Sequence, residues 1–230
     1  MIKLYPHNSL GHADYGWLQA RYHFSFGDYY NPARMGFGTL RVINDDCIKA
    51  GAGFDTHPHK NMEIITYVRK GAITHRDSQG NQGRTEAGDV QVMSAGTGIF
   101  HSEFNLENEA TTLFQIWIEP SKQHAKPRWG AHKFPQEFTK ETLPLLVSGD
   151  GTAPLQIYQD AYLYGGRIKA KGRVIQKIKY QAYIIVSKGE VAIENSLLKQ
   201  GDGAEITGQN QFEITATQDA EVLVIDVPKK

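Results

Sequence analysis

Hydrophobic and polar residues alternate in short runs along most of the chain. In the first half such runs occupy residues 40–44, 62–68, 71–77, 90–93 and 112–118; in the second half they occupy 161–164, 182–186, 191–193, 212–215 and 222–225. A period of two residues is that of a β-strand with one buried face, and long helical patterns are few. The pattern predicts an all-β protein.

Turn-forming residues separate these runs. Asp45-Asp46 is expected to be the turn that follows residues 40–44, and the segment 78–81 to be another. Glycine is the residue that most easily adopts positive φ, which many tight turns need. Glycines stand at the ends of several runs, namely at Gly51, Gly53, Gly71, Gly88, Gly96 and Gly98. Short strands with this punctuation predict a β-barrel.

The chain has 230 residues, which is enough for two domains that each bury a core. Residues 119–143 contain Pro120, Pro127 and Pro135, and they predict a crossing between domains with at most a short helical piece at 135–143. Segments 188–190 and 200–203 echo 69–71 and 87–89, which indicates a weak internal repeat. We therefore expect one barrel in residues 1–120, a connection in 121–150 and a second barrel in 151–230.

Charge and cysteine content narrow the possible functions. Lys plus Arg equals Asp plus Glu, at 25 each, so no overall field attracts nucleic acid or an anionic membrane. A small-molecule ligand suits this neutrality better. Cys47 is the only cysteine, which excludes an internal disulfide. The sequence shows no secretory signal and no long apolar segment, so we expect a cytoplasmic protein without membrane contact.

Two further segments have alternative interpretations. The first 38 residues are rich in aromatic side chains, which we expect to pack one end of a barrel, with a minority lining a ligand pocket. The segment 167–179 has no acidic residue but contains Arg167, Lys169, Lys171, Arg173, Lys177 and Lys179. This basic run is expected to be a solvated strand face, and an acidic partner or anionic ligand is the alternative.

The candidate chemistry lies in two pairs of residues, each separated by one position. His57 and His59 form the first pair, and His101 and Glu103 form the second. Residues i and i+2 of a strand project from the same face, so each pair can address one point. If the two strands lie close together, three imidazoles and one carboxylate converge. This donor set suits iron, copper, nickel, manganese or zinc, and an octahedral ion would keep two positions for other ligands.

Two other residues compete for places in this site. Glu63 would share the face of His57 and His59 in an unbroken strand, although it would lie about 13 Å from His59. Because Glu103 shares a face with His101, Glu103 is the preferred acid ligand. His75 and Asp77 repeat the i, i+2 spacing, but they lack the flanking glycines of the other pairs. We expect them to stabilise a turn or to support the ligands.

The sequence resembles a known family at these positions. The spacings are Gly51-x5-His57-x-His59-x3-Glu63-x7-Gly71 and Gly88-x5-Ser94-x-Gly96-x-Gly98-x2-His101-x3-Asn105. They are similar to the two cupin motifs, with Ser94 where many cupins have proline. The strings HFSFGDYYNP, GTLRVINDD, THPHKNMEIITYV and MSAGTGIFHSE closely resemble the pirin family. The resemblance is specific over residues 15–120 and looser in the second half.

The resemblance implies a bicupin, in which two double-stranded β-helix (jelly-roll) barrels share one chain and only the N-terminal one binds a metal. It implies the ligands His57, His59, His101 and Glu103 around one mononuclear divalent transition metal. Fe(II) is expected first, and Cu, Ni, Co, Mn or Zn are the alternatives. No histidine occurs after His132, so the second barrel cannot repeat such a site. Such a pair of barrels is expected to be a monomer.

The resemblance also implies an activity. Bacterial pirin-like proteins with these ligands resemble quercetin 2,3-dioxygenases, which open the central ring of flavonols with O2 and release carbon monoxide. Glu103 is then expected to be both a metal ligand and the catalytic base for the flavonol hydroxyl. An alternative is a metal-containing regulatory or interaction module, which the basic run favours. A third is a cupin isomerase, or a dioxygenase with another substrate, since fold alone does not determine chemistry.

Overall fold

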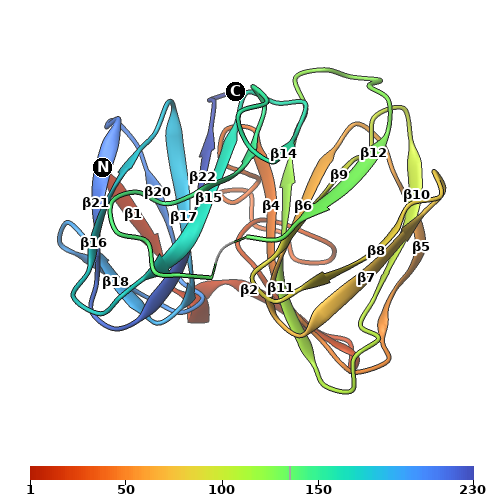
Figure 1. Ribbon diagram of the computed structural model, residues 1–230, viewed down its shortest axis with the longest axis horizontal. Helices are drawn as coiled ribbons and strands as arrows, with labels where there is room; N and C mark the ends of the chain where they lie inside the picture. The colour runs from red at the N-terminus through yellow and green to blue at the C-terminus, as the bar shows by residue number, and fades with distance from the viewer. Residues whose placement is uncertain (135) are drawn as a thin grey trace.

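The computed structural model describes residues 1–134 and 136–230, and it consists almost entirely of β-strands. Figure 1 shows two barrels side by side, the first formed mainly by the first half of the chain and the second mainly by the other half. Each barrel combines a seven-stranded and a four-stranded sheet. The all-β, two-barrel expectation is confirmed. No helix in the described part of the chain is both long and apolar enough to span a membrane.

The first barrel contains eleven strands. Its seven-stranded sheet has the order β12-β9-β6-β11-β4-β3-β2. The bounds of these strands are β2 Gly11–Asp14, β3 Leu18–Tyr22, β4 Leu40–Ile48, β6 Glu63–Lys70, β9 Val90–Ser94, β11 Thr111–Ile118 and β12 Arg128–His132. The opposing sheet has the order β5-β10-β7-β8, with β5 Gly53–His59, β7 Ala72–Asp77, β8 Gln82–Glu86 and β10 Ile99–Phe104.

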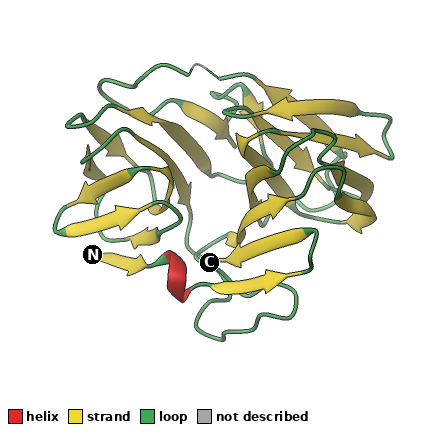
Figure 2. Cartoon of the chain, turned by 90° about the horizontal axis from the view of Figure 1, so that it is seen from below, coloured by secondary structure: helices red, strands yellow, loops and turns green. Residues whose placement is uncertain are grey.

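The second barrel repeats this division. Its larger sheet has the order β1-β20-β17-β22-β15-β13-β14, with β1 Ile2–Tyr5, β13 Leu145–Ser148, β14 Leu155–Gln156, β15 Tyr162–Ile168, β17 Gln181–Lys188, β20 Gly203–Ile206 and β22 Ala220–Val227. The smaller sheet has the order β16-β21-β18-β19, with β16 Arg173–Lys177, β18 Glu190–Ile193, β19 Ser196–Lys199 and β21 Gln211–Ala216. One short 3-10 helix, η1 (His7–Ser9), follows β1 and is drawn red in Figure 2.

Besides β13, which lies within the expected connection 121–150 and pairs with β15 of the second barrel, two strands depart from the expected division of the chain. β1 pairs with β20, which puts the start of the chain in the second barrel (Figure 1). β12 lies within the expected connection 121–150, yet it pairs with β9 of the first barrel. Both strands cover an otherwise open sheet edge. The expected helical piece at 135–143 is absent from residues 136–143, and Pro135 lies outside the described residues.

The two larger sheets pack against each other, and this explains the apolar character of their strands. One core cluster combines Ile43, Ile65 and Phe114 of the first barrel with Tyr183 and Ile225 of the second. The interior of the second barrel is filled by a separate apolar cluster. A strand such as β22, buried at every position, therefore has one face inside its barrel and the other against its neighbour.

A buried polar cluster fastens the N-terminal segment to the second barrel. Arg34 forms an ion pair with Glu205 at 2.5 Å and donates a hydrogen bond to the Tyr183 hydroxyl at 3.2 Å. The same hydroxyl lies 3.0 Å from Nδ1 of His23. Burial, followed by the nearby charge of Arg34, lowers the pKa of His23 to about 3. His23 is therefore neutral at physiological pH and accepts a hydrogen bond from Tyr183 in the protein core.

His23 should make folding stability depend on pH. Its pKa is about 3 in the folded protein and about 6.5 in an unfolded chain. As the pH falls below 6.5, the unfolded chain binds a proton at His23 that the folded protein does not bind, so stability is lost. Between pH 6.5 and 5, wild type should lose up to about 2 kcal/mol more than His23→Gln, measured by urea unfolding. Parallel pH profiles for the two proteins would contradict this assignment.

Candidate metal centre

The pairing of β5 with β10 brings the predicted histidines together. His101 is directly opposite His57, and Ile99 is opposite His59. The turn from β9 into β10 sets this register, and its Gly96 has a φ of 48°. A Cβ at Gly96 would lie 2.0 Å from the carbonyl oxygen of Ala125, so only glycine fits there. The glycine pattern of the sequence thus has a direct role in positioning the site.

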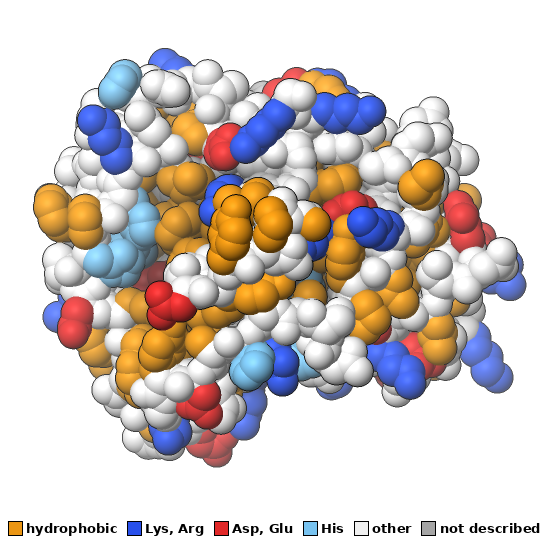
Figure 3. Space-filling model, turned by 180° about the vertical axis from the view of Figure 1, so that it is seen from behind, with side chains coloured by type: hydrophobic (Ala, Val, Ile, Leu, Met, Phe, Trp, Pro, Cys, Tyr) orange, Lys and Arg blue, Asp and Glu red, His pale blue; other side chains and the backbone are white. Residues whose placement is uncertain are grey.

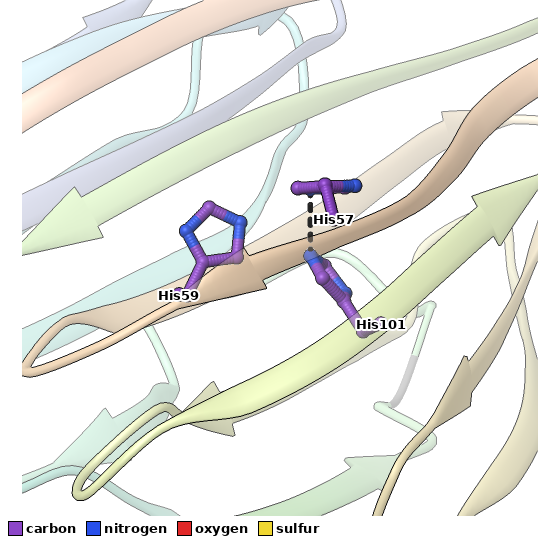
Figure 4. Close-up of side chains that lie close together, drawn as sticks. All are labelled: His57, His59 and His101. Carbon is purple, nitrogen blue, oxygen red and sulfur yellow. Dashed lines mark hydrogen bonds between the residues drawn. The ribbon is translucent and has the colours of Figure 1, made fainter.

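Three imidazoles converge at this place. Their ligand nitrogens, from His57, His59 and His101, all lie within 4.8 Å of one another. Figure 4 shows His57 and His59 on one strand and His101 on the next, with the rings directed toward one another. Nε2 of His57 and Nε2 of His101 are only 3.0 Å apart. The ring of His59 contacts that of Trp117 edge-on at a centroid distance of 4.9 Å.

The hydrogen-bond partners of these rings determine their tautomers. Nδ1 of His57 lies 2.6 Å from the carbonyl oxygen of Asp55 and must donate to it, so Nε2 of His57 has no hydrogen. Nε2 of His75 donates to the Asp77 carboxylate at 2.9 Å, which makes Nδ1 of His75 an acceptor. Nδ1 of His101 lies 3.5 Å from that acceptor, and Nε2 of His101 forms a shorter contact of 3.0 Å with Nε2 of His57. The single hydrogen of a neutral His101 ring can serve only one of these contacts. When it is on Nδ1, both Nε2 atoms are bare and can bind a metal.

Burial keeps these imidazoles neutral. Burial, followed by the effect of His57, lowers the pKa of His101 to about 2. The same two causes lower the pKa of His59 to about 4. A neutral imidazole has the free lone pair that metal binding requires. The cluster is therefore ready to bind a cation at neutral pH without first losing protons from these two rings.

Glu103 lies beside this cluster but belongs to a second, overlapping group of donors. It converges within 4.8 Å with His75 and His101 rather than with His57 and His59. A register shift in β10 between His101 and Glu103 accounts for part of this difference. The Glu103 carboxylate accepts hydrogen bonds from the side chains of Thr66, Gln91 and Gln115. Burial still raises its pKa to about 7, against the effect of these three donors.

Glu63 lies elsewhere, because the strand assumed for it is interrupted. β5 ends at His59 and β6 begins at Glu63, with Asn61 at a φ of 47° between them. The buried Glu63 carboxylate accepts a hydrogen bond from Ser94 at 2.5 Å. Among the described residues, neither group of three convergent donors includes Glu63. The premise of an unbroken strand through His59 and Glu63 was therefore wrong.

His75 has a closer relation to the site than its spacing alone suggested. Besides its bond to Asp77, the His75 ring stacks on Trp129 with a centroid distance of 5.0 Å and an interplanar angle of 9°. Asp77 in turn accepts hydrogen bonds from Asn81, as in a turn. The expected turn-stabilising and supporting roles thus both occur. The contact of His75 with His101 was not evident from the sequence, because it joins two strands that are 26 residues apart.

A cavity of about 420 Å³ opens beside the histidines. Figure 3 shows histidine side chains next to hydrophobic side chains on this face of the first barrel. His57, His59 and Glu103 all line the cavity. Its other lining side chains include the aromatic residues Trp17, Tyr22, Phe26, Phe54 and Trp117, and the polar residues Asn44, Asp46 and Gln115. The aromatic N-terminal segment therefore lines a pocket with three of its rings, as was expected of a minority of them.

Asn44 and Asp46 were not recognised as cavity residues from the sequence. Asp45-Asp46 was expected to form a turn, but β4 continues through both residues to Ile48. Asp45 forms an ion pair with Arg69, and Asp46 is paired with Ala20 of β3. The alternation of Val42, Asn44, Asp46 and Ile48 on one face was the available signal. This signal was missed because two consecutive aspartates are typical of a turn.

Comparisons with known proteins agree with this geometry. The family model described as Pirin matches residues 4–118, and the one described as Quercetinase C-terminal cupin domain matches residues 145–227. A pirin-like protein of Caulobacter vibrioides is 47% identical over 98% of this chain and 99% of its own length. A quercetin 2,3-dioxygenase of Escherichia coli K12 is 42% identical over 99% of each chain. The crystal structure of the bacterial pirin YhhW from Escherichia coli in complex with nickel(II) has a TM-score of 0.93, with 41% identity and full coverage of both chains.

The tautomers can be measured directly in the metal-free protein. Two-bond 1H–15N correlation spectra at pH 7 should show His57 protonated at Nδ1, His75 protonated at Nε2 and His101 protonated at Nε2, through which it donates to His57 at 3.0 Å. Because the pKa of His101 is about 2, its signals should not shift between pH 7 and pH 4. Single His→Asn variants assign the signals. A His57 ring protonated at Nε2 at neutral pH would contradict this assignment.

Proposed function

The chain belongs to the pirin family, and from this membership and the site geometry we propose that it is a metal-dependent quercetin 2,3-dioxygenase. It would cleave the central ring of quercetin-like flavonols with O2 and release carbon monoxide. The strongest support comes from two structural features that occur at the same place. Three imidazoles aim their nitrogens at one region, and two of them also line a cavity with aromatic walls.

The residues of the site fit a divalent transition metal. Nε2 of His57 and Nε2 of His101 lie 3.0 Å apart, close enough for one cation to replace the hydrogen between them and to bind both. We expect His57, His59, His101 and Glu103 to hold one such ion, since mixed nitrogen and oxygen donors suit first-row transition metals. Fe(II) is the expected ion, and the nickel(II) complex of the related YhhW supports a divalent metal. When bound, the ion supplies positive charge that lowers the pKa of a substrate hydroxyl.

Supporting residues hold the ligands in this arrangement. The carbonyl oxygen of Asp55 fixes the His57 ring, and the pair of His75 and Asp77 fixes the His101 ring. Hydrogen bonds to the second ring nitrogen are the usual way in which proteins orient a metal-binding histidine. In a metal centre, the side-chain contacts from Asp77 through His75 to His101 would orient the His101 ring toward the ion.

Glu103 has the properties of a general base. Its pKa of about 7 lies near physiological pH, where proton transfer to a carboxylate is most effective. The hydrogen bonds from Thr66, Gln91 and Gln115 hold the carboxylate in a single orientation. In the proposed reaction, Glu103 accepts the proton of the flavonol 3-hydroxyl. It lines the same cavity as His57 and His59, so it faces a ligand bound there.

The walls of the cavity suit a flat aromatic ligand. Trp17 and Phe54 meet edge-to-face at 5.1 Å, and Phe26 and Trp117 do so at 5.4 Å. Such rings offer large apolar surfaces with little conformational freedom. A volume of about 420 Å³ lies within the range of small-molecule pockets. The aromatic walls would orient the flavonol and keep water away from its activated ring.

Three of the six cations of the basic run form close ion pairs within the protein. Arg167 pairs with Glu221, Lys169 with Asp219 and Lys179 with Asp160, each at 2.8–2.9 Å. Ile168 and Ile178 point to the buried side, as expected for a solvated strand face. Acidic groups of neighbouring elements therefore neutralise much of this charge. The regulatory alternative loses the sequence feature that favoured it.

Turnover of quercetin is the direct test of this proposal. Protein loaded with Fe(II) or Ni(II) should remove flavonol absorbance only in the presence of O2, with release of carbon monoxide. His101→Ala should lower the rate at least about 100-fold, because a metal ligand is lost. His132→Ala changes an exposed histidine of β12 outside the cluster and should leave the rate unchanged. If the metal-loaded protein consumes no flavonol and forms no carbon monoxide, the proposed activity is wrong.

The choice of acid ligand can be tested by metal binding. Glu103→Gln should lower the affinity for Ni(II) at least about 10-fold, whereas Glu63→Gln should change it less than about twofold. Protons compete with the metal for a carboxylate whose pKa is about 7. Wild-type affinity should therefore fall as the pH drops below 7, and this dependence should be weaker in Glu103→Gln. The opposite ranking of the two variants would make Glu63 the ligand.

A further inference from the structure

Two polar side chains on β4 face the cavity with unsatisfied hydrogen-bonding atoms. Asn44 and Asp46 are 4% and 2% exposed, and both line the cavity. Oδ1 of each side chain is buried without a hydrogen-bond partner among the residues that the structure describes. Gln115 of β11 is directly opposite Asn44 in the strand register. The side-chain amide of Gln115 already forms other hydrogen bonds, because its Nε2 donates to Glu103 and its Oε1 accepts from Trp117.

These two residues lower the stability of the folded protein. A buried polar atom without a partner destabilises a protein, and a buried carboxylate does so more strongly. Burial, followed by repulsion from Asp45 and Glu103, raises the pKa of Asp46 well above its usual range. The surrounding core positions Leu18, Ile48 and Leu113 are apolar. Apolar residues at positions 44 and 46 would complete this core, so stability does not explain the polar ones.

Their position relative to the histidines indicates a use. β4 belongs to the seven-stranded sheet, whereas β5 with His57 and His59 belongs to the four-stranded sheet that faces it. The cavity lies between these two inner faces. A ligand bound by the histidines therefore extends across the cavity toward β4. The two Oδ1 atoms on β4 are hydrogen-bond acceptors, and hydroxyl groups of the ligand can donate to them.

We propose that Asn44 and Asp46 form a polar subsite that accepts hydrogen bonds from ring hydroxyl groups of a polyhydroxylated aromatic substrate. This inference rests on the proposed function and specifies the substrate class of the same cavity. A ligand that lacks these hydroxyl groups leaves both oxygens unpaired in a buried place. Such sites reject the ligand that lacks the hydroxyl much more strongly than an apolar pocket rejects an extra one. Asn44 and Asp46 thus select for hydroxylated rings.

Binding without turnover isolates this subsite. The protein is loaded with Zn(II), which has no redox chemistry, and is titrated under argon with quercetin and with 3-hydroxyflavone, which keeps only the 3-hydroxyl. Wild type should prefer quercetin at least about 10-fold. Asn44→Leu and Asp46→Leu should each reduce this preference at least about fivefold, with little change in the affinity for 3-hydroxyflavone. Cys47→Ser alters the adjacent position on the other face of β4 and should keep the full preference.

Stability provides an independent readout. Both leucine variants should unfold at an equal or higher urea concentration than wild type, because each removes an unpaired buried polar group. A residue with a merely structural role would lower the midpoint instead. Asp46→Asn keeps the shape of the side chain and serves if a leucine variant does not fold. It should lose part of the preference for quercetin.

The outcomes separate this inference from the proposed function. If quercetin binds with the expected preference but is not consumed when a redox-active metal and O2 are present, the subsite is supported and the dioxygenase activity is not. If neither flavonol binds, a titration with catechol, resorcinol and phenol decides. A preference for the diols that is lost in Asp46→Leu supports the subsite. The inference is overturned if wild type shows no preference for the more hydroxylated ligand. It is also overturned if the variants lose affinity equally for the more and the less hydroxylated ligand.

Discussion

The antiparallel pairing of β5 with β10 is the constraint on which the site depends. It puts His57 directly opposite His101, and the hydrogen bond that His57 donates to the carbonyl oxygen of Asp55 leaves its Nε2 bare, 3.0 Å from Nε2 of His101. Two ring nitrogens at this distance can share one hydrogen or bind one cation, so the arrangement fits half of a coordination shell. The tight turn at Gly96 and the stacking of His75 on Trp129 both serve to hold this register and these ring orientations.

The larger sheets explain how the protein tolerates such a polar interior. Their outward faces bury one apolar core between the barrels, and the second barrel fills its own interior with apolar side chains. This burial supplies most of the favourable free energy of folding. The first barrel can then keep polar groups on its inner face, where Thr66, Gln91 and Gln115 surround Glu103. The second barrel thus acts as a scaffold for the chemistry of the first.

The sequence predicted what depends on local periodicity. The two-residue spacing identified the strands and the convergence of His57, His59 and His101, because side chains of a strand alternate strictly. It failed where the chain departs from regular strands or pairs at long range. The turn at Asn61 removed Glu63 from the ligand face, and β1 joined a strand about 200 residues away. Asp45-Asp46 has the composition of a turn, yet an ion pair to Arg69 and two neighbouring strands keep it extended.

Two buried carboxyl groups share the cavity, and their different surroundings indicate different roles. Glu103 is held by three donors, so its orientation is fixed and its pKa stays near 7. Oδ1 of Asp46 has no partner, and its carboxyl is opposed by the charges of Asp45 and Glu103. Two acids whose environments give them different pKa values commonly have different roles in a site. A carboxyl that is satisfied in the free protein suits the reacting centre, which must be preorganised, whereas an unsatisfied one gains its partner only from a ligand.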